Sequence, residues 1–155
     1  MPNGSKNGSK KKKIFIVEDH PLFRAMLVQL IDQEPDMTVC GQADNIQEAL
    51  RLIEQTLPDA AIVDLTLSGS IGLELIKDLK ARHLRLPVLV LSLHEGRLFE
   101  ERALRAGAQG YLSKEESPAE VVKAIRTVLD GRIHVSEGIA GTVLARLGQV
   151  DPTVQ

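Results

Sequence analysis

A short apolar run that ends on a carboxylate, Ala60–Leu65, constrains the fold more than any other stretch of the chain. A run this short and this rich in branched residues is typical of a strand buried on both faces, as in a parallel sheet. The interior of such a sheet does not accommodate Asp64. We therefore expect Asp64 at the carboxyl end of the strand, which is the edge where open α/β sheets bind their ligands.

Three other strand-like runs also lead into polar side chains. Ile14–Val17 is followed by Glu18 and Asp19, Val88–Leu91 by Ser92, and Gly110–Ser113 by Lys114. Because the carboxyl ends of parallel strands meet at one edge of a sheet, we expect these side chains to converge on Asp64. The sequence therefore predicts one polar site built from residues that are far apart in the chain.

Helical patterns separate these strands, and a further strand is expected at Thr38–Ala43. Apolar residues recur at helical spacing after Pro21, after Asp44, from Leu73 to Leu79, from about Gly96 to Ala106, and after Ser117. Asp44 with Gln47, and Ser117 with Glu120, have the spacing of helix N-caps. Gly107 is expected to end the helix before it, which is polar and rich in arginine. Five strands that alternate with five helices through short loops predict a parallel sheet covered on both faces. Right-handed crossovers then favour a doubly wound, three-layer α/β/α sandwich.

Composition limits the other possibilities. The 155 residues suffice for one domain, and the formal net charge of −2 gives no global attraction to nucleic acid. The single cysteine, Cys40, excludes an intramolecular disulfide and fits a reducing compartment. No apolar run approaches the roughly 18 residues of a membrane span. We expect a soluble, cytoplasmic chain without a membrane partner.

Glu18, Asp19 and Asp64 would repel one another if they met, and each would raise the proton affinity of the others. A hard divalent cation relieves that repulsion, and Mg²⁺ suits a few carboxylate oxygens with water completing its shell. Lys114 and Ser92 would add a positive charge and a hydroxyl donor. Such surroundings suit a phosphoryl group, and Asp64 is the carboxylate expected to attack phosphorus and form an acyl phosphate.

These residues resemble the receiver domain of two-component response regulators. The matching stretches are Val17–His20, Asp64, Gly72–Glu74, Leu91–Ser92 and Gly107–Lys114, within a region from about Lys12 to Arg132. Asp19–Leu22 and Gly107–Lys114 look most like the NarL/FixJ (LuxR-type) subgroup. The resemblance implies a flavodoxin/CheY-like fold with the strand order 2-1-3-4-5.

The resemblance also implies a role for each site residue. Asp64 accepts phosphate from a sensor histidine kinase. Mg²⁺ is held by Asp19, Asp64 and the backbone carbonyl of Thr66, with Glu18 acting largely through water. Lys114 and Ser92 bind the phosphoryl group, Ser92 and Tyr111 form the switch, and Thr66 and His94 tune the lifetime of the phosphate. A phosphorylated copy is expected to be able to form a homodimer.

The chain departs from the family pattern in one loop and at its end. Ser68 stands where family members commonly have Pro, four residues after the phosphoacceptor. We expect a disordered basic tail over residues 1–12, a receiver domain over 13–132, and a linker with a short helix at Ile139–Leu147 over 133–155. That last segment is too short for a helix-turn-helix, so DNA contact is expected only through an output domain that this chain does not contain.

Three rival interpretations are weaker or need experiment. A haloacid-dehalogenase-type aspartyl phosphatase would need a second Asp at position 66, which is Thr66. A flavin-binding module would need a glycine- and hydroxyl-rich loop where Glu18–Pro21 stands. A receiver-like interaction domain that works without phosphorylation stays open. We expect a phosphoacceptor rather than an enzyme, and we interpret His20, His83 and His134 as structural or surface residues.

Overall fold

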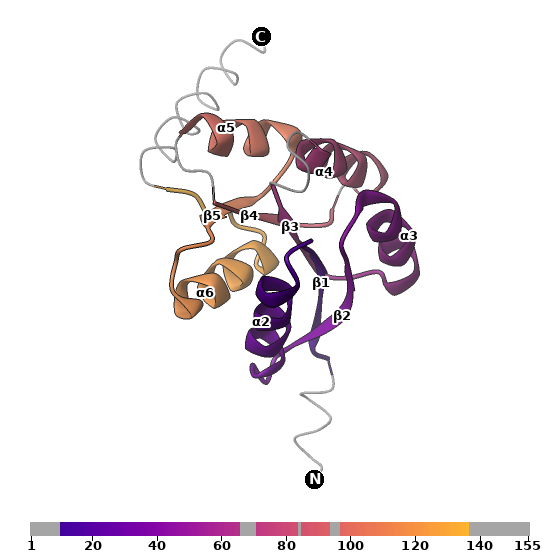
Figure 1. Ribbon diagram of the computed structural model, residues 1–155, viewed down its shortest axis with the longest axis vertical. Coiled ribbons are helices and arrows are strands. Elements are labelled where there is room, and N and C mark those ends of the chain that lie inside the picture. Colours follow the sequence, from indigo (N-terminus) through magenta and orange to yellow (C-terminus); the bar gives the residue numbers. More distant parts are fainter. Residues whose placement is uncertain (1–9, 66–70, 84, 94–96, 137–155) are drawn as a thin grey trace.

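The computed structural model describes residues 10–65, 71–83, 85–93 and 97–136. Five parallel strands form one sheet in the order β2-β1-β3-β4-β5 (Figure 1). The strands are β1 Lys12–Val17, β2 Met37–Ala43, β3 Ala60–Asp64, β4 Val88–Ser92 and β5 Gly110–Ser113. This is the expected sheet and strand order, and β1, β3 and β4 lie in its interior, where their near-continuous apolar sequences place them.

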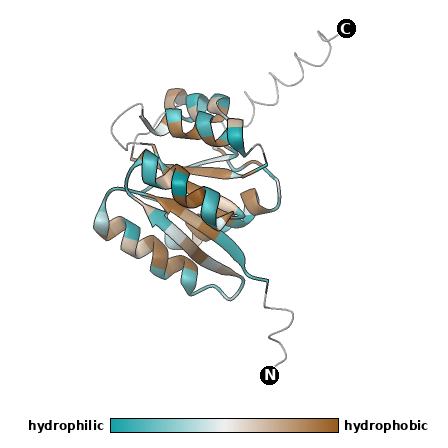
Figure 2. Cartoon of the chain, turned by 90° about the vertical axis from the view of Figure 1, so that its right-hand side faces the viewer, coloured by the Kyte–Doolittle hydropathy of each residue, from teal (hydrophilic) through white to brown (hydrophobic). Residues whose placement is uncertain are grey.

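Helices cover both faces of the sheet. They are α2 Pro21–Asp32, α3 Ile46–Thr56, α4 Ile71–Arg82, α5 Arg97–Ala106 and α6 Pro118–Leu129. Helices α2 and α6 bury apolar side chains with one face of the strands, and α3, α4 and α5 with the other. In Figure 2 the largely hydrophobic strands lie between helices with hydrophilic residues on their outer sides. The predicted three-layer sandwich is confirmed.

The helix ends follow the local sequence, with one correction. The N-cap of α3 is Asn45, whose side chain accepts a hydrogen bond from the Glu48 amide at 2.9 Å, and not Asp44 with Gln47 as the spacing suggested. Two consecutive residues with good capping side chains made the sequence ambiguous by one position. Ser117 caps α6 as predicted, accepting from the Glu120 amide at 3.3 Å.

Two glycines govern how helices end or approach the sheet. Gly107 follows α5 with φ 119°, so the expected terminator is confirmed. Gly72 lies in α4 where a Cβ atom would come within 2.7 Å of the Leu65 carbonyl oxygen and 3.0 Å of the Asp64 carbonyl oxygen. The absent side chain therefore lets α4 start directly against the carboxyl end of β3.

Some expectations concern residues outside the described ranges. These are the first nine residues of the tail expected over 1–12, the loop containing Ser68, and the helix at Ile139–Leu147. The end of that tail was predicted wrongly, because Lys12 is the first residue of β1 and its amide donates to the Asp36 carbonyl oxygen at 3.0 Å. Within the described part of the chain, no helix has the length and apolarity that crossing a membrane requires. Cys40 is only half-buried beside the apolar cluster under α3, and burial raises the pKa of its thiol.

Candidate functional site

The register of the sheet brings the predicted site residues to one edge. Val17 pairs with Val63, Asp64 with Leu91, and Ser92 with Ser113. Glu18 directly follows Val17, and Lys114 directly follows Ser113. Both residues therefore lie at the carboxyl edge of the sheet, where β3 ends with Asp64. The convergence expected from the sequence is therefore present, and it depends on strand register rather than on sequence proximity.

Lys114 joins two buried carboxylates. Its Nζ atom lies 3.0 Å from Glu18 Oε2 and 3.2 Å from Asp64 Oδ2. The side chains of Lys114, Glu18 and Asp64 are 4%, 2% and 0% exposed, so all three charges are withdrawn from water. Buried charges need such partners, because desolvation of an unpaired ion is very costly. One ammonium group thus compensates two carboxylates only in part.

His20 also belongs to this cluster, although its spacing suggested a structural or surface residue. Its Nδ1 atom lies 2.9 Å from Glu18 Oε2, 3.3 Å from Asp19 Oδ1 and 3.8 Å from Asp64 Oδ2. The His20 amide donates a further hydrogen bond to Glu18 Oε2 at 3.1 Å. The imidazole reaches the acids through the turn before α2, a geometry that no helical or strand spacing indicates.

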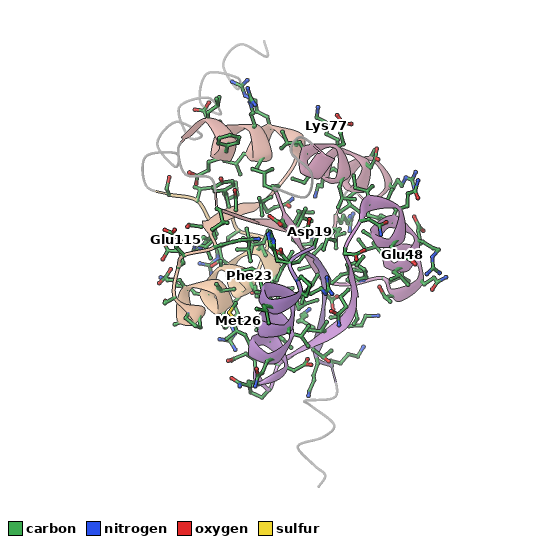
Figure 3. The ribbon with its side chains drawn as sticks, viewed as in Figure 1. Asp19, Phe23, Met26, Glu48, Lys77 and Glu115 are labelled. Carbon is green, nitrogen blue, oxygen red and sulfur yellow. The ribbon has the colours of Figure 1, made fainter. Side chains whose placement is uncertain are left out.

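Two side chains from the first turn of α2 contact residues of the acidic cluster or its lysine. Arg24 donates a hydrogen bond from Nη1 to the Glu18 carbonyl oxygen at 2.7 Å. The Phe23 ring centroid lies 4.6 Å from Lys114 Nζ, within the range of a cation–π contact. Figure 3 labels Asp19, in the segment that leads into α2, and Phe23, in the first turn of α2. Neither Phe23 nor Arg24 was predicted to contribute to the site.

The electrostatic surroundings of Glu18 disfavour its charged form. Burial raises the pKa of the Glu18 carboxyl, and the charge of Asp64 raises it further, while hydrogen bonds from His20 and Lys114 act in the opposite direction. A raised pKa means that the carboxylate form is disfavoured in this pocket. An additional cation would favour that form again.

The donor set fits a hard cation. Glu18, Asp19, His20 and Asp64 each offer one ligand atom, and these atoms lie within 4.8 Å of one another. Carboxylate oxygens of this kind are the ligands that Mg²⁺ prefers. The expected contribution of the Thr66 carbonyl lies outside the described residues. The acidic cluster itself, however, has the residue types and the spacing for a divalent ion.

Of the remaining predicted residues, Ser92 lies at the same edge, Tyr111 lies within β5, and His94 lies outside the described ranges. Ser92 is fully buried at the end of β4, and its carbonyl oxygen accepts a hydrogen bond from the Lys114 amide at 2.9 Å. Tyr111, 7% exposed on β5, belongs to the apolar cluster that Phe99 and Ala103 of α5 complete.

Comparison with known proteins agrees with this geometry. Residues 14–126 match the model of the response regulator receiver domain. The chain is 34% identical over 134 residues to the nitrate/nitrite response regulator protein NarL of Escherichia coli, covering 86% of this chain and 62% of NarL. It is 33% identical over 135 residues to the DNA-binding transcriptional activator DevR/DosR of Mycobacterium tuberculosis, covering 87% of this chain and 62% of that protein.

A solved structure gives the same result. The crystal structure of a LuxR-family two-component response regulator from Aurantimonas sp. SI85-9A1 superposes with a TM-score of 0.79 at 35% identity, covering 88% of this chain and 97% of that one. The chain spans less than two thirds of the length of NarL and DevR/DosR. Residues 14–126, which match the receiver-domain model, include all four residues of the acidic cluster and Lys114. The chain belongs to the response regulator receiver domain family, among relatives of the NarL and LuxR type.

Proposed function

We propose that the chain is the signal-receiving domain of a two-component regulator and that Asp64 accepts a phosphoryl group from the phosphohistidine of a sensor kinase. The P–N bond of the phosphohistidine breaks, and a P–O bond forms to a carboxylate oxygen of Asp64. One observation carries the proposal. Lys114 Nζ lies between Asp64 and Glu18, at 3.2 and 3.0 Å, on the ligand-binding edge of the sheet.

Each neighbouring residue has a role in the proposed reaction. Asp19 and Asp64 would hold Mg²⁺, together with the backbone carbonyl of Thr66, and Glu18 would act largely through water. When bound, Mg²⁺ neutralises the acids and stabilises the charge that develops on the phosphoryl oxygens. Lys114 then pairs with the phosphoryl group and balances its charge. Ser92 donates a hydroxyl to it from the end of the neighbouring strand.

The proposed switch follows from the change in charge. Phosphorylation adds about −1.5 to −2 charges at pH 7 to an edge that already holds three carboxylates. Ser92 moves toward this group, and the ring of Tyr111 repacks against α5. Helix α5 and the buried ring of Tyr111 can pack only in discrete arrangements. The added charge can therefore favour one arrangement over another, and with it a different surface at α5.

We propose no enzymatic turnover for the chain beyond slow loss of its own phosphate. Receiver domains are phosphoacceptors, and a haloacid-dehalogenase-type phosphatase would need an aspartate where Thr66 stands. Thr66 and His94 are proposed to set how long the phosphate persists. The name of DevR/DosR, a DNA-binding transcriptional activator, supports a further proposal, that the regulated output is transcription.

Intact mass after incubation with acetyl phosphate and Mg²⁺ tests the proposal. The unmodified sequence is expected to gain one phosphoryl group, and Asp64→Asn none. Asp78→Asn, an exposed aspartate on α4, is the matched control and should gain it. A gain that survives Asp64→Asn would reject Asp64 as the acceptor. No gain by the unmodified sequence would favour an interaction domain that works without phosphorylation.

A further inference from the structure

The chain that leaves α6 returns to the open edge of the sheet. His134 forms a parallel bridge with Gly110 of β5. The Tyr111 amide donates to the His134 carbonyl oxygen at 2.9 Å, and the His134 amide donates to the Gln109 carbonyl oxygen at 3.0 Å. Because β5 is the last strand of the sheet, this segment satisfies backbone groups that an edge strand otherwise leaves open.

A buried carboxylate on α5 holds the next part of the same segment. Glu100 is only 6% exposed, although α5 looked polar and arginine-rich. Its Oε2 atom accepts the Ser136 amide at 2.8 Å, and its Oε1 atom accepts the Ser136 hydroxyl at 2.9 Å. Both carboxylate oxygens are thus used by one residue. Hydrogen bonds to a charged group are the stronger kind, and removing one partner leaves a desolvated charge.

The route of the chain is specified locally at Gly131. This glycine follows α6 with φ 82°, its amide donates to the Val128 carbonyl oxygen, and the Arg132 amide donates to the Thr127 carbonyl oxygen, which is the double hydrogen bond of a Schellman turn. At Gly110, a Cβ atom would come within 2.8 Å of Leu89 and 3.0 Å of Val128, so the absent side chain lets β5 pack closely against β4 and α6. The His134 carbonyl oxygen lies at 3.4 Å from that Cβ position, an ordinary contact distance, beside the bridge to Gly110.

We propose that the edge of β5 and Glu100 form an intramolecular docking site for residues 132–136, and that phosphorylation of Asp64 releases this segment. The release step rests on the proposed function. The site has one arm on β5, through the Tyr111 amide, and a second arm on α5, through Glu100. Tyr111 lies three residues before Lys114, and its ring belongs to the cluster that includes Ala103 of α5. In the proposed switch, a shift of α5 relative to β5 would separate the Tyr111 and Glu100 contacts of the segment.

Amide hydrogen exchange of the full chain, read residue by residue by NMR, tests the docking. We compare the unmodified sequence with Glu100→Gln, Ser136→Ala and, as a matched control, Glu74→Gln on the exposed side of α4. Glu100→Gln should accelerate exchange at Ser136 and His134 at least about tenfold, the loss expected for a bond to a charged group. Ser136→Ala keeps the amide bond and should have a smaller effect, and Glu74→Gln none.

The Leu65 amide, which donates to Leu91 inside the sheet, is the reference for folding. Faster exchange at Ser136 and His134 with an unchanged Leu65 supports the docking site. Unchanged exchange at Ser136 in Glu100→Gln overturns it. If a variant loses protection at Leu65, it is not used, and the docking site is judged from the unmodified sequence alone. Unprotected amides at both His134 and Ser136 in that protein also overturn the docking site.

The release step is tested on the same sample after treatment with acetyl phosphate and Mg²⁺, with intact mass as the measure of phosphorylation. Phosphorylated protein should show at least about tenfold faster exchange at His134 and Ser136, since both arms lose their alignment. Phosphorylated protein with unchanged exchange overturns release alone. A sample that gains no phosphoryl group overturns release together with the proposed function, whereas docking is judged on the unmodified protein.

Discussion

Lys114 is the residue on which the charge balance of the acidic edge depends. It lies within 3.2 Å of two carboxylate oxygens, from Glu18 and Asp64, and its own side chain is almost fully buried. The other side chain that contacts these carboxylates, His20, is 58% exposed. Interactions of an exposed group are screened by water more than those of a buried one, so the lysine contributes more to the stability of the unliganded site.

Replacing Lys114 with Met should destabilise the metal-free protein by about 3 kcal/mol, because two buried carboxylates lose their main partner. Urea unfolding at neutral pH in the presence of a chelator measures the loss. Lys77→Met, an exposed lysine on α4, is the control and should change the free energy of unfolding by less than about 0.5 kcal/mol. Combining Lys114→Met with Glu18→Gln should recover part of the loss. Equal stability of the two lysine variants would contradict the assigned role.

Single residues differ in how well the sequence could place them. Glu18, Asp19, Asp64 and Lys114 were predictable because each directly follows or ends an apolar strand, and parallel strands end at one edge. His20 was not, since it reaches the acids through an irregular turn. Sequence spacing could indicate ligands only on regular elements. The one sequence feature that could have indicated this role is that His20 directly follows the two acids Glu18 and Asp19.

At the scale of secondary structure, the start of α4 depends on its closeness to β3. Gly72→Ala would place a methyl group 2.7 Å from the Leu65 carbonyl oxygen, and backbone cannot rotate away as a side chain can. We expect a loss of about 1–3 kcal/mol in the free energy of unfolding and weaker Mg²⁺ binding, because the end of β3 carries Asp64. Urea unfolding and Mg²⁺ titration calorimetry measure the two effects.

Gly131→Ala provides a contrast to Gly72→Ala. No atom lies within 4 Å of the added Cβ, but the residue has φ 82°, so the cost comes from backbone conformation alone, about 1–2 kcal/mol. Its Mg²⁺ affinity should stay unchanged, because the glycine lies after α6 and far along the chain from the acids. Equal weakening of Mg²⁺ binding in both variants would show that the effect of Gly72→Ala is not local.

An ion-pair cluster on the surface, formed by Arg126, Glu34 and Asp36, joins α6 to the turn that follows α2. Arg126 donates from Nη2 to Glu34 at 2.7 Å and to Asp36 at 2.9 Å, and from Nε to Asp36 at 3.2 Å. This guanidinium holds the pKa of the Asp36 carboxyl below its ordinary value of 3.8. The Asp36 side chain is 56% exposed, so solvent screens the pair and its contribution stays below about 1 kcal/mol.

Because Arg126→Met removes this ion-pair cluster, it should lower the free energy of unfolding by an amount that depends on pH. Because the pKa of Asp36 is lower in the folded than in the unfolded chain, the pair stabilises the fold above about pH 4. That stabilisation is lost as the pH falls through the lowered folded pKa. Unfolding curves of Arg126→Met and the unmodified sequence should therefore differ near neutral pH and converge in acid. Lys123→Met, without such partners in the described contacts, should show a difference that does not depend on pH in this way.

Periodicity predicted the elements well where a helix had one apolar side. It predicted α6 from its valines and isoleucine, and these are buried. For α5 it was less informative, since Leu98 is 56% exposed whereas Ala103 and Glu100 are buried. An alanine and a glutamate do not stand out as buried positions in a hydrophobic pattern, so the sequence did not predict that Ala103 and Glu100 face the interior. Among the described contacts, Ser136 of the returning segment is the partner that accounts for the burial of Glu100.

At the scale of the whole molecule, the sheet holds like charges together against their repulsion. The strand order places β1 beside β3, so Glu18 and Asp19 meet Asp64 whenever the protein is folded. The charge of Asp64 helps to raise the pKa of Glu18, which is a direct sign of that repulsion. The unfolded chain separates these acids. Repulsion therefore lowers the stability of the folded state, and a bound cation raises it.

Asp64→Asn should consequently change stability in opposite directions with and without Mg²⁺. In a chelator it relieves the repulsion with Glu18, so its free energy of unfolding should exceed that of the unmodified sequence. At an Mg²⁺ concentration of about 100 times the dissociation constant, the unmodified sequence gains about 2.7 kcal/mol, and Asp64→Asn gains much less, so the order reverses. Urea unfolding under both conditions measures this, with Asp78→Asn as the control that follows the unmodified sequence. An order that stays the same in chelator and in Mg²⁺ would mean that Asp64 is not a ligand, because only loss of coordination makes the two effects opposite in sign.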